Sequence, residues 1–77
     1  MNIATGYYMN LFSRDGRTDV FVIFNEPNPE PTAAEFNAIA ELVEQALAEG
    51  ATARDITIRL ETSGLDCTTF GVQVFTK

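Results

Sequence analysis

The sequence contains no histidine and only one cysteine, Cys67. Without histidine the chain has no His-based catalytic triad, no histidine general base and no His-containing metal site. One cysteine forms neither an internal disulfide framework nor a zinc site, and we expect Cys67 at the start of a strand as a small residue. P-loop, Gly-x-Gly-x-x-Gly and Gly-x-Ser-x-Gly motifs are also missing. These absences argue against an enzyme and imply no cofactor and no metal ion.

Long apolar runs are missing as well. No segment approaches the roughly 20 apolar residues that span a bilayer, and residues 1–10 have neither the basic region nor the apolar run of a signal peptide. The apolar content of 45% is ordinary for a globular chain, and 77 residues are too few for two hydrophobic cores. We therefore expect one domain, residues 1–77, located in the cytoplasm and not bound to a membrane.

Basic residues are scarce, and residues 25–50 contain none. Five Lys and Arg stand against eleven Asp and Glu, which gives a formal net charge of −6. Outside residues 25–50 the charges cancel, so the net charge comes from six glutamates: Glu26, Glu30, Glu35, Glu41, Glu44 and Glu49. A field of one sign on one side of a small domain attracts basic surfaces and repels nucleic acid. We expect these glutamates to contact a protein partner with a basic surface, and not nucleic acid directly. The alternative is a solvated helix face that only maintains solubility.

A β-hairpin is predicted near the N-terminal end. Residues 3–13 and 18–25 alternate apolar and polar side chains, as strands do. Between them, Asp15-Gly16 is a strong signal for a type I′ turn. The turn then pairs Arg14 with Arg17 and places three apolar pairs on one face of the sheet: Leu11–Val20, Met9–Val22 and Tyr7–Phe24.

A helix is predicted after a connector that is rich in proline. The three prolines of residues 25–31 indicate an extended segment near polyproline II, with a proline-rich ligand for an aromatic groove as the alternative. Thr32 and Glu35 form a capping box that begins the helix, and Gly50 ends it. Its apolar stripe has the 3.6-residue period and comprises Phe36, Ile39, Ala40, Val43 and Leu47. We expect this helix to lie on a sheet.

The C-terminal third reads as a second hairpin. Residues 54–61 alternate with Ile56, Ile58 and Leu60 inward, and residues 68–76 alternate with Phe70, Val72 and Val74 inward. The element order is then ββαββ. We predict an α+β fold in which one amphipathic helix packs on one face of a four-stranded antiparallel sheet of order 2-1-3-4.

The outward face of the first hairpin is apolar, although a solvated sheet face is normally polar. Four outward residues are Tyr8, Phe12, Phe21 and Ile23, and Phe75 of the last strand joins them. Because one helix covers only one side of the sheet, these side chains form an exposed patch of the kind that marks interfaces. We expect the patch to bury against a second copy in a homodimer or to dock a different protein. Coverage by sheet twist or by the proline-rich connector is the third possibility.

The small size, the acidic stretch from Glu26 to Glu49 and the missing catalytic groups resemble, in general character, phage-encoded inhibitors such as anti-CRISPR proteins. This resemblance implies a non-enzymatic inhibitor in the host cytoplasm that acts as a nucleic-acid mimic. Its carboxylates would occupy phosphate-like positions and compete with DNA or RNA for a cationic groove. Glu41 and Glu44 rise about 4.5 Å apart along the helix and Glu49 lies about 12 Å from Glu41, although the three fan around the axis. The alternative function is a small homodimeric structural or accessory protein whose acidity serves only solubility.

Overall fold

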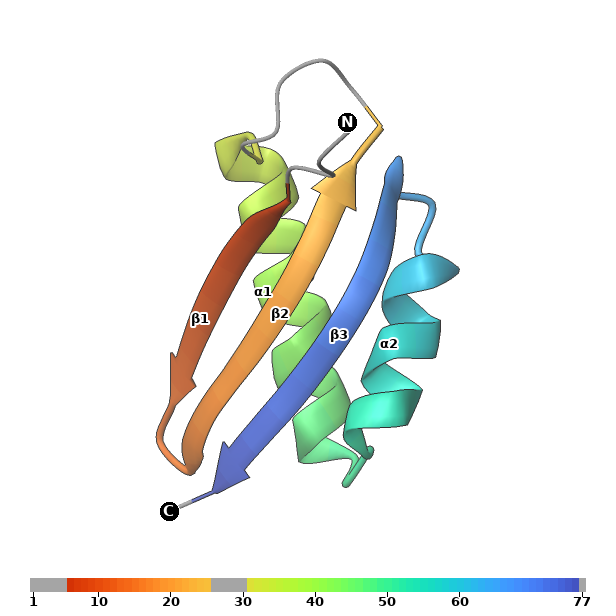
Figure 1. Cartoon of the computed structure of the whole chain (residues 1–77). Helices are drawn as coiled ribbons and strands as arrows, with labels where there is room; N and C mark the ends of the chain where they lie inside the picture. The colour runs from red at the N-terminus through yellow and green to blue at the C-terminus, as the bar shows by residue number, and fades with distance from the viewer. Residues whose placement is uncertain (1–5, 26–30, 77) are drawn as a thin grey trace.

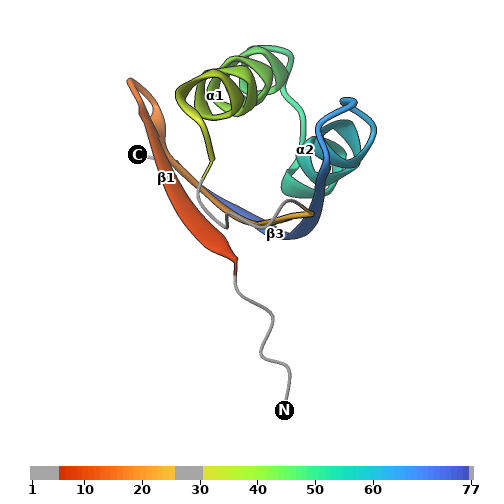
Figure 2. The same ribbon diagram turned by 90° about the horizontal axis from the view of Figure 1, so that it is seen from above.

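The computed structural model describes residues 6–25 and 31–76, which form a sheet and two helices. The elements in chain order are β1 (Tyr7–Ser13), β2 (Gly16–Phe24), α1 (Ala33–Ala48), α2 (Ala53–Glu61) and β3 (Cys67–Thr76). The strands form an antiparallel sheet in the order β1-β2-β3 (Figure 1). Figure 2 shows both helices on the same, concave side of the sheet. Within the described ranges, neither helix is long and apolar enough to cross a bilayer.

The predicted four-stranded sheet of order 2-1-3-4 with a single helix is wrong. Residues 54–61, predicted as the third strand, lie within α2, so the described part of the chain contains three strands. The central position of the sheet belongs to β2, which pairs with β1 on one side and with β3 on the other. The fold is therefore α+β with two helices on one face of a three-stranded sheet.

The first hairpin forms as predicted, but its register differs by two residues. Ser13 pairs with Gly16, which places Tyr7 opposite Val22 instead of Phe24. A shift of two residues keeps each side chain on its own face, whereas a shift of one would exchange the faces. The apolar side of the hairpin therefore still faces the helices, where Met9, Val20, Val22 and Phe24 are buried.

The turn of this hairpin consists of Arg14 and Asp15, and it is not of type I′. Type I′ requires positive φ at both central residues, and no non-glycine residue in the described ranges has a positive φ. Gly16 instead belongs to β2 and has a φ of +153°. A Cβ atom at Gly16 would overlap the carbonyl oxygen of Phe75. The glycine is needed here because the backbones of β2 and β3 approach closely, and not because of the turn.

The first helix, α1, begins and ends at the predicted signals. The Oγ1 of Thr32 accepts a hydrogen bond from the Glu35 N–H at 3.2 Å, and the Glu35 carboxylate accepts one from the Thr32 N–H at 2.8 Å. Gly50 follows the helix with a φ of +79°, the left-handed conformation that ends many helices. The proline-rich connector predicted before this helix lies mostly outside the described residues.

The second helix, α2, begins with a capping box of its own. The Thr52 Oγ1 accepts a hydrogen bond from the Asp55 N–H at 3.3 Å, and the Asp55 carboxylate accepts one from the Thr52 N–H at 3.2 Å. Ile56 and Leu60, one helical turn apart, are 0% and 1% exposed, whereas Ile58 is 50% exposed. Residues i and i+4 thus reach the core, and the alternation that indicated a strand arises because Ile58 lies on the solvent side.

The last strand, β3, contains a β-bulge where it pairs with Phe21 and Val22 of β2. Phe21 pairs with Gly71 while its neighbour Val22 pairs with Thr69, so Phe70 is the extra residue. The extra residue changes the phase of the alternation: Thr69 is buried against the core, and Phe70 lies on the outer face with 59% exposure. The prediction that Phe70 points inward is therefore wrong.

Candidate protein-binding face

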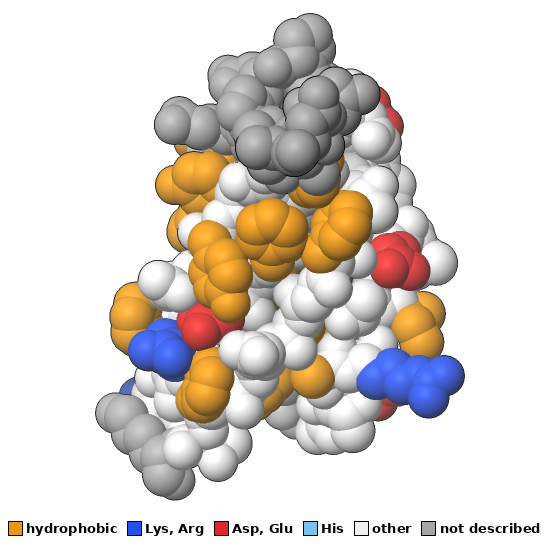
Figure 3. Space-filling view, viewed as in Figure 1, with side chains coloured by type: hydrophobic (Ala, Val, Ile, Leu, Met, Phe, Trp, Pro, Cys, Tyr) orange, Lys and Arg blue, Asp and Glu red, His pale blue; other side chains and the backbone are white. Residues whose placement is uncertain are grey.

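The side of the sheet opposite the helices carries a group of exposed aromatic side chains. We call it the open face and define it by the six apolar residues Tyr8, Phe12, Phe21, Ile23, Phe70 and Phe75. Four of them are large and well exposed: Tyr8 (56%), Phe12 (77%), Phe70 (59%) and Phe75 (45%). Figure 3 shows hydrophobic side chains gathered on this side of the strands. No helix of the described ranges covers them, because α1 and α2 share the opposite side (Figure 2).

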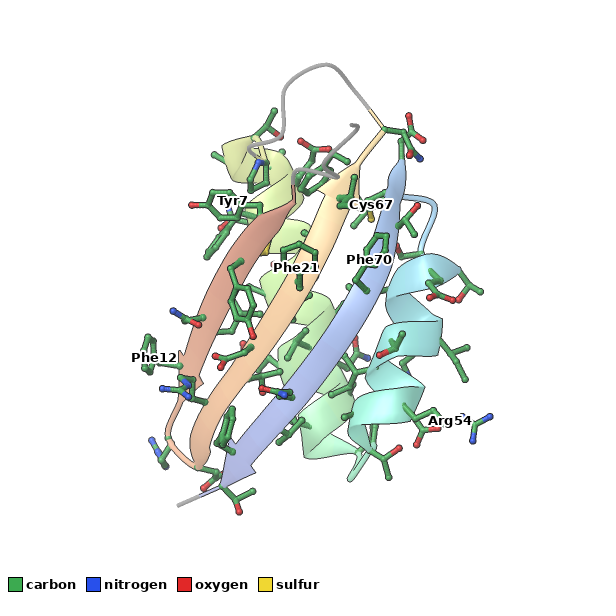
Figure 4. All side chains as sticks on the ribbon, in the orientation of Figure 1. Tyr7, Phe12, Phe21, Arg54, Cys67 and Phe70 are labelled. Atoms are coloured by element: carbon green, nitrogen blue, oxygen red, sulfur yellow. The ribbon has the colours of Figure 1, made fainter. Side chains whose placement is uncertain are left out.

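Three of these rings contact one another across the three strands. The ring centroids of Tyr8 and Phe21 are 5.7 Å apart, and those of Phe21 and Phe70 are 5.9 Å apart in an edge-to-face arrangement. Figure 4 shows the Phe21 and Phe70 rings beside each other over β2 and β3. Phe21 also lies over Gly6, where an added Cβ would come within 2.5 Å of its ring. The cluster is therefore held in place before any partner binds, which lowers the entropic cost of binding.

Near Phe75, the open face also carries two charged residues that neutralise each other, Arg17 and Asp19. The Arg17 guanidinium lies over the Phe75 ring at 4.6 Å from its centroid. The Arg17 Nε is 3.0 Å from the Asp19 Oδ1, and Asp19 is only 7% exposed. The ion pair holds this buried carboxylate close to a cation, although the oxygen has no hydrogen bond of good geometry within the described residues. The open face consequently presents apolar surface with no net charge from these two residues.

The sequence identified most of the open face. Tyr8, Phe12, Phe21, Ile23 and Phe75 all lie on it, as predicted; Phe21 and Ile23 are half-buried and the other three are exposed. Sequence reasoning missed Phe70, which the bulge turns outward. The signal that could have found it is the neighbouring glycine, because a glycine inside a strand pattern often marks a bulge.

The predicted acidic face is smaller than the six glutamates suggest. Glu26 and Glu30 lie outside the described residues. Glu35 is engaged in the capping box of α1. Glu49 accepts a hydrogen bond from the Arg59 Nη1 at 2.7 Å, and this contact raises the pKa of Arg59. Two of the four described glutamates are therefore engaged by neighbouring groups of the chain.

Glu41 and Glu44 remain exposed on α1 and form no ion pair within the described ranges. They are three residues apart on one helix, and no basic residue accompanies them on α1. Since α1 lies behind the sheet in the view of Figure 1, these two carboxylates are on the helical side of the molecule and not on the open face. These two carboxylates and the open face thus lie on opposite sides of the protein.

Two shallow hollows lie between the hairpin end of the sheet and α1. One has a volume of about 340 Å³ and is lined partly by Leu11, Phe36, Ala40 and Leu47, along the side of β1. The other, of about 540 Å³, is lined by the hairpin turn, the C-terminal end of α1 and the end of β3, and it shares Glu44 with the first. The larger hollow is lined by two acidic residues, Asp15 and Glu44, together with Arg14 and Arg17. Both acidic residues are exposed to solvent, whereas paired carboxylates that act as acid and base need an apolar site that separates their pKa values.

The single cysteine, Cys67, is the first residue of β3, where the sequence predicts it. It is half-buried, and this burial raises the pKa of its thiol, with Glu35 and Asp66 contributing in the same direction. A thiol with a raised pKa carries little nucleophilic thiolate at neutral pH. In the described part of the chain, no group of three or more His, Cys, Asp or Glu side chains is placed to hold a metal ion.

Comparison with known proteins gives no match. No protein-family model, no curated protein and no solved structure is significantly similar to this chain.

Proposed function

We propose that this protein is a non-enzymatic protein-binding module that docks a partner on the open face of its sheet. The observation that carries the proposal is the exposure of Tyr8, Phe12, Phe70 and Phe75 on one face, between 45% and 77%. Contiguous exposed apolar surface on a small domain typically marks a binding site. Aromatic residues are the usual anchors of protein interfaces.

The chemistry of the open face indicates the kind of partner. Its charged residues, Arg17 and Asp19, neutralise each other, and Asp19 is buried. A complementary surface would therefore be apolar and nearly uncharged at its centre. Nucleic acid does not fit this description, because neutralising its phosphates requires several basic residues, and Arg17 is the only one on the open face among the described residues.

Two matched variants test this proposal in affinity purifications from cells of the source organism, followed by mass spectrometry. Phe70→Lys places a charge on the open face at a position that is 59% exposed, so the fold should tolerate it. The double variant Glu41→Lys/Glu44→Lys reverses two charges on the other side of the molecule. We expect the first variant to lose a partner that the wild-type protein and the second variant both retain.

The interaction with that partner is then measured by titration calorimetry with purified proteins. Loss of a central aromatic anchor typically costs about 2 kcal/mol or more, which weakens binding roughly 30-fold. Burial of apolar surface should also give a negative heat-capacity change of binding. If Phe70→Lys binds as tightly as the wild-type protein, the open face is not the docking surface.

The acidic side of α1 supports a second candidate function. Glu41 and Glu44 are exposed, have no ion pair within the described ranges and share a helix that carries no basic residue. In this case the protein is an inhibitor or adaptor, of the anti-CRISPR type in its sharpest form, whose acidic side blocks a basic surface of a nucleic-acid-binding complex in the host cytoplasm. The same experiment separates the candidates, because here the double variant loses the partner and Phe70→Lys retains it.

A further inference from the structure

The outer edge of β1 is an open strand edge without the features that usually protect one. No described residue pairs with it, since β1 is the first strand of the sheet and contacts only β2 in the ladder. Natural edge strands avoid association through charged side chains, proline, bulges or a covering element. In β1, residues 7–13 read Tyr-Tyr-Met-Asn-Leu-Phe-Ser, with no charge and no proline. Its pairing with β2 is continuous, without a bulge.

The opposite edge of the sheet is protected in two of these ways. β3 carries the bulge at Phe70, and α2 packs against β3. Figure 1 shows α2 running alongside β3, whereas no helix of the described ranges runs alongside the outer edge of β1. The difference between the two edges points to β1 as the one available for pairing.

The residues of β1 are arranged symmetrically about Asn10. Tyr8 and Phe12 lie two positions on either side of it and point to the open face, while Met9 and Leu11 lie one position on either side and face the helices. Two antiparallel copies of β1 centred on Asn10 would place Tyr8 opposite Phe12, Met9 opposite Leu11, and Asn10 opposite itself. Aromatic residues then face aromatic residues, and the two amides face each other. A slip of two residues in either direction would set Asn10 against Tyr8 or Phe12.

We propose that the partner of the β1 edge is a second copy of this chain, paired antiparallel through β1 with its two-fold axis at Asn10. Such an interface is isologous, because each contact between residue i and residue j is repeated as j to i. It joins the two sheets into one of six strands with all four helices on the same side. Tyr8 and Phe12 form two symmetric aromatic cross-strand pairs, which are the stabilising units of an antiparallel sheet.

Phe12 provides the second structural reason for this arrangement. It is the most exposed of the large hydrophobic residues that the structure describes, at 77%. Figure 4 shows its ring at the edge of β1, away from the Phe21 and Phe70 rings. Pairing across the edge of β1 covers the Phe12 ring. A partner that docks on the centre of the open face would not need to contact this ring. The inference goes beyond the proposed function, since the dimer uses Tyr8 and Phe12 and leaves Phe21, Phe70 and Phe75 of the open face available.

Disulfide trapping tests the pairing and its register. In a Cys67→Ala background, Asn10→Cys places one thiol opposite its own copy, within the Cα separation of 4.4–6.8 Å that a disulfide spans. We expect this variant to form a covalent dimer on mild oxidation. Ser13→Cys in the same background is the control, because it keeps both Tyr8 and Phe12: the two thiols would be six residues apart along the strands, about 20 Å, and should not cross-link.

Sedimentation equilibrium measures the dimer without a cross-link. We expect the wild-type protein to be dimeric at micromolar concentrations, and Phe12→Lys to weaken the dimer about tenfold or more through loss of both aromatic pairs. Phe70→Lys should remain dimeric, because Phe70 lies on β3. A wild-type protein that is monomeric at about 100 μM, a concentration at which even weak dimers form, overturns the inference. Cross-linking of Ser13→Cys in preference to Asn10→Cys also overturns it. A dimer lost in Phe70→Lys and retained in Phe12→Lys overturns it too, since that result means face-to-face stacking. None of these results decides whether a different protein docks on the open face.

Discussion

Two isoleucines of α2 provide a matched test of the fold, because a helix and a strand assign them different environments. Ile56 is fully buried in the core and Ile58 is half exposed. Replacing a buried isoleucine by alanine typically costs about 2–5 kcal/mol, from lost apolar burial and from the cavity left behind. The total stability expected for 77 residues is only about 4–12 kcal/mol. Ile56→Ala should therefore remove a large part of the free energy of unfolding.

Ile58→Ala is the control with the same change of side chain. It leaves no enclosed cavity, and alanine has a higher helix propensity than isoleucine by a few tenths of a kcal/mol, so we expect a cost below about 1 kcal/mol. Urea unfolding followed by circular dichroism measures both at the same protein concentration. With a denaturant slope of about 1 kcal/mol/M, the midpoint should fall by about 2 M or more for Ile56→Ala and by less than about 1 M for Ile58→Ala. Equal losses for the two variants would mean that residues 54–61 bury one alternating face, as a strand does, and would refute α2.

Three further predictions concern local contacts. Thr52→Ala should destabilise the protein by the roughly 1 kcal/mol typical of a lost N-cap. The hydrogen bond from the Thr52 backbone N–H, together with the Thr52 side chain, lowers the pKa of Asp55 below its ordinary value of 3.8. The stability that ionised Asp55 contributes is therefore complete above pH 3.8 and is lost as the pH falls through the lower folded-state pKa. Asp55→Asn should remove this pH dependence from acid unfolding curves. Gly16→Ala should lower the free energy of unfolding by more than about 2 kcal/mol, since the new methyl group overlaps a backbone oxygen of β3. Gly50→Ala, at a positive φ but in open space, should lower it by only about 1–2 kcal/mol. Thermal melts of both variants measure the difference. Iodoacetamide should alkylate Cys67 more slowly than free glutathione at pH 7.5, because burial raises the pKa of its thiol, and an equal rate measured by mass spectrometry would contradict this.

The parts of the fold that the sequence predicted correctly are those with a local signal. The capping box of Thr32 and Glu35 and the terminal Gly50 marked α1, because each satisfies backbone groups that a helix end leaves without partners. The alternation of β1 and β2 assigned the faces of the hairpin, and with them most of the open face. These signals involve residues that are close in sequence and need no knowledge of the rest of the chain.

α2 was misread because its residues satisfy two periods. Ile56, Ile58 and Leu60 alternate as in a strand, but Ile56 and Leu60 are also one helical turn apart, and Thr52 and Asp55 carry a capping-box signal before them. The β-branched side chains of Ile56 and Ile58 favour strands only weakly, since context decides strand propensity. The capping box is the more specific of the two signals, and giving it priority would have identified the helix.

The register of the hairpin and the orientation of Phe70 depend on contacts between distant strands. Gly16 reads as a turn residue, yet it serves the close approach of Phe75 in β3, about sixty residues later. The bulge at Phe70 likewise exists only relative to β2. The ion pairing of Glu49 with Arg59 depends on how α1 and α2 pack, so the sequence overestimated the number of available acidic groups. Non-local geometry accounts for each of these differences.

The account depends most on the open face being accessible to solvent in the folded protein. Relaxation of aromatic NMR signals by a soluble paramagnetic agent measures this directly, with Phe24 as the internal reference because it is 5% exposed. We predict strong broadening of the ring signals of Phe70 and Phe75 and almost none for Phe24. Protection of Phe70 equal to that of Phe24 would contradict the account, because the surface proposed to receive a partner would already be covered.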